Sequence, residues 1–205
     1  MLLSKHFVFI HVQKTGGTTV RSILEKHAPE EWELTDFGQH PTYADIPPSH
    51  AHLPKFAFVR NPYSWYVSWY HFQRNRERSD IYLEVSENDT LGFADTMRRM
   101  FKIRPELKHG SGPLLQYLWK ALGPGLEGIK AGKMENMRDD LARILGECCE
   151  MPTAMEAAIA SLPVLNASPH DHYSNYYDEE LRDLIYEKDK PIFQHFDYSF
   201  ESPPN

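Results

Sequence analysis

The fold of this 205-residue chain is decided near its start, by Phe7-Val8-Phe9-Ile10-His11-Val12-Gln13-Lys14-Thr15-Gly16-Gly17-Thr18-Thr19. The apolar run at residues 7–10 predicts a buried strand. Beyond the glycine pair, apolar residues recur at helical spacing, and Pro29 is placed to end that helix. The positions on one face of the helix are Val20, Ile23, Leu24 and His27. A strand that passes through two glycines into a helix directs consecutive N–H groups at one point, where they can surround a phosphate.

The order of residues in this loop indicates which kind of phosphate site it forms. In a Walker A loop, G-x-x-x-x-G-K-[ST], the lysine follows the glycines. Here Lys14 precedes Gly16 and Gly17, and the sequence has no glycine upstream of them. Lys14 supplies a mobile positive charge, and hydroxyl donors come from Thr15, Thr18 and Thr19. The competing interpretation is an ordinary Gly-Gly turn between a strand and a helix, with an exposed lysine.

A second strand-to-helix junction strengthens the phosphate interpretation. Residues 55–59 predict another buried strand, and Arg60 follows it directly. Asn61 suits the N-cap of a helix and Pro62 its first position. Arg60 then lies at the carboxyl end of a strand, where arginine can bind phosphate in a bidentate manner, and Ser68 lies two turns into the helix. Four aromatic residues of this helix are expected in the core rather than on a ligand: Trp65, Tyr66, Trp69 and Tyr70.

Both junctions resemble motifs of sulfotransferases that use 3′-phosphoadenosine-5′-phosphosulfate (PAPS). The run K-T-G-G-T resembles their 5′-phosphosulfate loop, and H-V-Q-K-T-G-G-T is especially similar to the heparan sulfate 6-O-sulfotransferases. The run R-N-P-Y-x-x-x-x-S-x-Y resembles their 3′-phosphate motif, although many relatives have a charged residue where this chain has Trp65. The resemblance assigns the 5′-phosphosulfate to Lys14, Thr15, Gly16, Gly17, Thr18 and Thr19, and the 3′-phosphate to Arg60 and Ser68.

The family resemblance also implies a reaction and its catalytic residues. Lys14 would stabilise the transferring sulfuryl group and the leaving phosphate, and a general base would take the proton of an acceptor hydroxyl. Our candidate base is His40, because H-x-[ST]-x-x-[DE] between the two motifs resembles the catalytic-histidine segment of heparan sulfate 2-O- and 6-O-sulfotransferases. Other sulfotransferases use glutamate, so Glu33 is the alternative, followed by His50 and His52.

The alternation of strands and helices favours an α/β fold with a parallel sheet. The resemblance makes this a P-loop-like three-layer fold, with a central, mainly parallel sheet flanked by helices. We expect a single domain over 1–205, with residues 74–113 as a helical insertion near the acceptor site. Residues 31–54 predict an irregular connection, residues 128–132 a short strand and residues 137–148 a helix.

Two further predictions concern the C-terminal part of the chain. Asn166–Tyr173 resembles a late loop of the same sulfotransferases, which could close over the nucleotide. A terminal helix is expected after its N-cap, Asp178, with Leu181, Leu184 and Ile185 on its apolar face.

Composition limits the partners that the protein can have. With 22 basic and 29 acidic residues, the formal net charge is −7, which argues against a general binder of nucleic acid. The two cysteines are adjacent and fit a reduced, cytoplasmic compartment. No apolar stretch is long enough to span a bilayer. Together with these limits, the resemblance implies a bacterial-type sulfotransferase that needs no metal and sulfates a hydroxyl on a glycan or glycoconjugate. The alternatives are a P-loop kinase and a nucleotide-binding module without catalysis.

Overall fold

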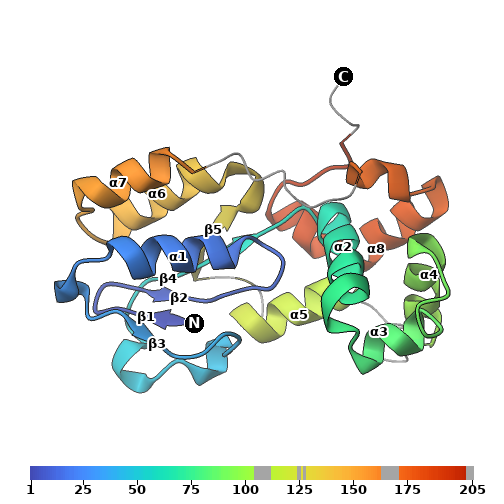
Figure 1. The fold of residues 1–205 in the computed structure, drawn as a ribbon, viewed down its shortest axis with the longest axis horizontal. Helices are drawn as coiled ribbons and strands as arrows, with labels where there is room; N and C mark the ends of the chain where they lie inside the picture. The colour runs from blue at the N-terminus through green and yellow to red at the C-terminus, as the bar shows by residue number, and fades with distance from the viewer. Residues whose placement is uncertain (104–111, 124–125, 127, 163–170, 202–205) are drawn as a thin grey trace. The chain divides into compact units, whose positions relative to one another are not determined.

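The computed structural model describes residues 1–103, 112–123, 126, 128–162 and 171–201. The chain divides into two compact units (Figure 1). One unit comprises Met1–Arg60 and Leu118–Asn166, and the other comprises Asn61–Tyr117 and Ala167–Asn205. The single-domain expectation stays a prediction. Most of the late loop predicted at Asn166–Tyr173 lies outside the described residues.

The first unit is built on a five-stranded sheet whose order is β3-β1-β2-β4-β5. The strands are β1 (Leu2–Leu3), β2 (Val8–Phe9), β3 (Thr35–Asp36), β4 (Lys55–Val59) and β5 (Ile129–Lys133). Parallel pairing joins β2 to β4 and β4 to β5, with Val8 opposite Lys55 and Ala57 opposite Ala131. The strand β1 is antiparallel to both β2 and β3. The strands predicted at residues 55–59 and 128–132 are confirmed, and the antiparallel edge is an addition that the sequence did not indicate.

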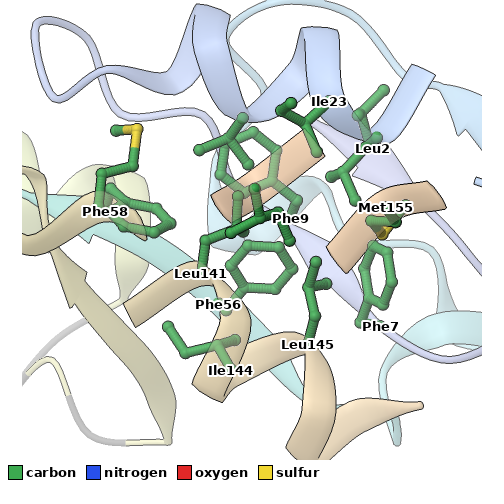
Figure 2. Close-up of a cluster of buried hydrophobic side chains, with 14 of the residues drawn as sticks. Leu2, Phe7, Phe9, Ile23, Phe56, Phe58, Leu141, Ile144, Leu145 and Met155 are labelled. Carbon is green, nitrogen blue, oxygen red and sulfur yellow. The ribbon is translucent and has the colours of Figure 1, made fainter. Parts of the chain in front are cut away.

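Three helices cover one face of this sheet: α1 (Gly17–His27), α6 (Met137–Cys148) and α7 (Thr153–Ala160). Figure 2 shows the core between these helices and the sheet. In it, the ring centroids of Phe9 and Phe56 are 5.0 Å apart. Side chains alternate along a strand, so the intervening residues of β2 and β4, such as Val8 and Ala57, point to the opposite face. They are fully buried as well. Burial on both faces explains the continuous apolar runs of these strands.

One close approach in the sheet requires a glycine. A Cβ added at Gly132 on β5 would lie 2.6 Å from the ring of Phe58 on the neighbouring strand β4. The ring of Phe58 fills the space that any larger side chain would need. The start of α1 at the glycine pair and its end before Pro29 agree with the sequence prediction.

The second unit is helical. It contains α2 (Pro62–Phe72), α3 (Asp80–Val85), α4 (Phe93–Ile103), the first part of α5 (Pro113–Leu122) and α8 (Glu179–His195). A π-helical turn, Gln73–Glu77, follows α2. The side chain of Asn61 accepts a hydrogen bond from the Tyr63 N–H, which confirms the predicted N-cap. Three of the four aromatic residues predicted to be core are buried, and Trp69 is half-buried.

The long helix α8 carries a buried carboxylate that the sequence did not reveal. Its predicted N-cap is confirmed, because Asp178 accepts from the Leu181 N–H at 2.9 Å. Further along, Asp189 has non-helical backbone angles and a fully buried side chain. Tyr66 Oη donates to its carboxylate at 2.5 Å, and the Leu115 N–H donates at 3.0 Å. Burial raises the pKa of Asp189 to about 7.

In the described part of the chain, no helix combines the length and apolar character needed to cross a membrane.

Candidate functional site

The loop between β2 and α1 has the backbone geometry of an anion site. Lys14 and Gly16 have positive φ angles of 63° and 80°, and Gly16 is the N-cap of α1. The N–H groups of Thr19 and Val20 both donate to the Gly16 carbonyl. The N–H groups before them, at Gly17 and Thr18, precede the first helical hydrogen bond. The first turn of α1 contains no acidic residue, so the positive end of the helix dipole is not neutralised.

Both glycines of the loop are needed, Gly16 because of its positive φ angle and Gly17 because the His11 ring lies against it. A Cβ at Gly16 would lie 2.2 Å from Met137 Cε, and a Cβ at Gly17 would lie 2.0 Å from His11 Cδ2. The hydroxyl of Thr15 is buried and donates to the Val12 carbonyl at 2.9 Å. This bond closes the loop on itself, so the Thr15 hydroxyl could donate to a phosphate only by breaking it. Of the other two predicted hydroxyl donors, Thr18 is exposed and Thr19 is half-buried.

Arg60 connects the second motif to this loop. It follows β4 directly, and its Nη1 donates to the carbonyl oxygen of Lys14 at 3.2 Å. Because β2 and β4 are parallel neighbours, their carboxyl ends meet at one edge of the sheet, which is where α/β folds bind ligands. The two positively charged side chains predicted to contact PAPS, Lys14 and Arg60, therefore belong to one local arrangement.

Ser68 is in a different position from the rest of the predicted set. It lies on α2 in the second unit, and only 4% of its surface is exposed. Its joint contact with Arg60 on a 3′-phosphate stays a prediction.

The predicted base, His40, also lies beside the loop between β2 and α1. The centroid of its exposed ring is 5.5 Å from that of His11, whose ring in turn lies against Gly17. The other two residues of its motif form a capping box. Asp45 accepts from the Thr42 N–H at 2.7 Å and from the Thr42 hydroxyl at 2.8 Å, and these bonds lower the pKa of the Asp45 carboxyl. The motif thus fixes the chain immediately after His40.

The alternative bases have different surroundings. Glu33 is exposed and ends a 3₁₀ turn with a φ angle of 52°. The Nδ1 atom of His50 lies 2.9 Å from the Ser49 hydroxyl, and His52 is exposed. Of the four candidates, His40 is the one with a ring contact to His11 in the described part of the chain. The choice of His40 as the base stays a prediction.

His11 is the residue of this region to which the sequence gave no role. Its ring is stacked on Phe9, with centroids 6.2 Å apart, and its Nδ1 atom is buried without a hydrogen-bond partner among the described residues. Burial, followed by the positive charges of His40, the amino terminus and Arg21, lowers the pKa of His11 to about 4. The imidazole is therefore neutral at neutral pH. Its position directly before the loop was the only signal in the sequence.

A metal site is not evident in the described parts of the chain, where no group of three or more His, Cys, Asp or Glu side chains could hold an ion. The expectation that the reaction needs no metal stays a prediction, as does the identity of the acceptor.

Comparison with known proteins supports the fold. No protein-family model and no curated protein matches the sequence. Among solved structures, the fold matches the crystal structure of a mouse sulfotransferase, SULT7A1, complexed with PAP. The match has a TM-score of 0.56 and 15% sequence identity, and it covers 94% of this chain and 85% of the mouse chain. At that identity the likeness establishes the fold. The predicted P-loop-like α/β fold, with its mainly parallel central sheet flanked by helices, is confirmed.

Proposed function

We propose that this protein is a PAPS-dependent sulfotransferase that moves a sulfuryl group to an acceptor hydroxyl. The observation that carries the proposal is the hydrogen bond from Arg60 to the Lys14 carbonyl, because it joins the two PAPS motifs at the start of α1. The likeness to a sulfotransferase complexed with PAP supports it further. An ordinary Gly-Gly turn between a strand and a helix would not need a hydrogen bond from Arg60 to the Lys14 carbonyl.

The residues present suit an anionic sulfated nucleotide. The N-terminus of α1 has no side-chain cap and no acidic residue in its first turn, and Gly16 and Gly17 let the backbone approach a ligand closely. Lys14 and Arg60 add two positive charges, and a guanidinium can bind phosphate in a bidentate manner. In this proposal Ser68 donates to the same 3′-phosphate as Arg60.

Each residue then has a defined part in the transfer. PAPS would supply the sulfuryl group, which is released when the bond between its sulfur and the 5′-phosphate oxygen breaks. The Lys14 ammonium and the N–H groups at the start of α1 stabilise negative charge on the transferring group and on the leaving phosphate. His40 takes the proton of the acceptor hydroxyl as the hydroxyl oxygen attacks. Positioning and preorganised charge provide most of the rate enhancement, as in phosphoryl transfer.

The acceptor is proposed to be a hydroxyl of a glycan or glycoconjugate. This part rests on the resemblance of the His40 segment to the heparan sulfate sulfotransferases. The net charge of −7 favours a neutral or lightly charged acceptor over a heavily sulfated polymer, because an acidic protein repels a polyanion.

The proposal is tested by ligand-dependent stability. PAP, which is adenosine 3′,5′-bisphosphate, should raise the unfolding temperature far more than AMP or ATP, since neither of those carries a 3′-phosphate. A ligand that binds only the folded state stabilises it by about 2.7 kcal/mol at 100 times its Kd. Differential scanning fluorimetry with equal concentrations of the three nucleotides measures the difference.

The matched variant for this test is Arg60→Ala, which should lose most of the preference for PAP over AMP. Equal shifts from AMP and PAP in the wild type would contradict the 3′-phosphate assignment. A response to Mg²⁺-ATP alone would favour a kinase. Labelled sulfate transfer from PAPS across an acceptor panel then separates an enzyme from a binding module.

A further inference from the structure

A second histidine, His11, lies next to the proposed base His40, and a purely structural role does not account for its hydrogen bonding. The buried Nδ1 atom of His11 has no hydrogen-bond partner among the described residues. A buried polar atom without a partner destabilises the folded state relative to one that has a hydrogen bond. Such an atom calls for an explanation, and a group that forms its bond only during the reaction is one.

The surroundings of His11 fix the orientation of its ring. The Cδ2 and Nε2 edge faces Gly17, where an added Cβ would lie 2.0 and 2.4 Å from these two atoms. One ring face is stacked on Phe9. Nδ1 belongs to the opposite edge of the imidazole, away from Gly17. In this orientation Nδ1 is the ring nitrogen that points away from Gly17.

The distance to His40 suits a hydrogen bond between the two rings. Two imidazoles joined by an N–H···N bond of normal length have centroids about 5 Å apart, and those of His11 and His40 are 5.5 Å apart. A neutral imidazole has one acceptor nitrogen, whereas a protonated imidazole has two donors and none. A neutral His40 that keeps its free nitrogen for the acceptor carries its N–H on the other nitrogen, and the proton that it takes makes that N–H a charged and stronger donor to Nδ1.

We propose that His11 is a positioning residue that accepts a hydrogen bond at Nδ1 from His40 when His40 takes the acceptor proton. This inference rests on the proposed function. In the step, the acceptor O–H bond breaks and its proton goes to His40, while the acceptor oxygen bonds to sulfur and the bond from sulfur to the 5′-phosphate oxygen breaks, releasing PAP. No other reactant is needed. His11 holds the resulting imidazolium in place, as a third group orients the base in other catalytic sites.

The low pKa of His11 is consistent with this role. A histidine that stays neutral above about pH 4 keeps its acceptor lone pair while its neighbour gains a proton. The groups whose charges act on His11 are His40, the amino terminus and Arg21, and all of them oppose its protonation. Arg21 itself is paired with Glu25 and Asp36.

The first test needs neither PAPS nor an acceptor. Side-chain ¹⁵N spectra of the labelled protein should show His11 with its proton on Nε2 and Nδ1 unprotonated at neutral pH. As pH falls and His40 gains a proton, the Nδ1 resonance of His11 should move, and this response should vanish in the His40→Ala variant. A proton on Nδ1, or a resonance indifferent to His40→Ala, would overturn the inference whatever the enzyme does.

The second test uses turnover and a conservative rescue. His11→Phe keeps a ring but removes the acceptor, so kcat should fall about tenfold or more while the Kd of PAP stays nearly constant, because hydrogen bonds to charged groups are among the strong ones. His11→Asn places an amide oxygen close to the position of Nδ1 and should recover part of the loss. In the His40→Ala background, His11→Phe should cost nothing further, since residues acting as one unit are not additive.

The outcomes separate this inference from the proposed function. A wild-type protein that neither binds PAP nor transfers sulfate would refute the function, and the ¹⁵N spectra would still decide whether the two rings interact. An active enzyme in which His11→Asn is as slow as His11→Phe, or in which the loss persists beside His40→Ala, would retain the function and refute the role of His11.

Discussion

Replacing Gly17 by alanine tests the packing around the loop between β2 and α1. The added Cβ would lie 2.0 Å from Cδ2, 2.4 Å from Nε2 and 2.9 Å from Cγ of His11. Ordinary carbon contacts are about 3.5–4.0 Å, so the ring or the start of α1 must move by more than about 1 Å. The φ angle of Gly17 is not in the positive range, and the cost is therefore steric rather than conformational.

The expected destabilisation follows from the cost of overpacking. Inserting a methyl group into a packed region costs about 1–3 kcal/mol. For a chain of this length, each kcal/mol lowers the unfolding temperature by about 2–4 °C, so Gly17→Ala should lower it by about 2–12 °C. Thermal unfolding followed by circular dichroism, with urea unfolding as a second measurement, gives the value.

Two variants make the interpretation specific. Gly146→Ala is the same chemical change within α6, at a position with no neighbouring atom within 4 Å of the added Cβ. It should be neutral or stabilising by up to about 1 kcal/mol. His11→Ala removes the ring that Gly17→Ala would strike, so the cost of Gly17→Ala should nearly disappear in that background. If Gly17→Ala is as stable as Gly146→Ala, or if its cost is unchanged by His11→Ala, the packing argument is wrong.

Two other predictions concern carboxyl groups. Because burial raises the folded pKa of Asp189 to about 7, above the unfolded value near 3.8, its protonation stabilises the fold below about pH 4 and that contribution is lost as pH rises to about 7. The free energy of unfolding of an Asp189→Asn variant, measured by urea unfolding, should therefore rise relative to that of the wild type as the pH is raised from 5 to 8. A difference between the two proteins that stays constant across that range would contradict the shift. Thr42→Val removes a hydroxyl that lowers the pKa of Asp45, so the ¹³C titration midpoint of that carboxyl should rise, whereas Thr42→Ser should leave it nearly unchanged.

Much of the fold could be predicted because its signals are local. The apolar runs at Phe7–Ile10 and Phe56–Val59 are continuous, as expected of strands that are buried on both faces. The two glycines after Lys14 form the turn at the start of α1. The helix caps Asn61 and Asp178 accept hydrogen bonds from N–H groups two and three residues further along the chain, so the local sequence alone specifies them. The antiparallel strand Leu2–Leu3 was missed because two residues carry no periodicity.

The sequence by itself predicted the class of site, because motif order and residue type indicate phosphate chemistry within one short segment. It could not determine which side chains from distant segments meet. The ring contact between His11 and His40 joins residues 29 positions apart, and the bond between Tyr66 and Asp189 spans 123 positions. Only the tertiary structure decided that His11 is half-buried and neutral beside the loop, since desolvation depends on what packs around a group rather than on its neighbours in the chain.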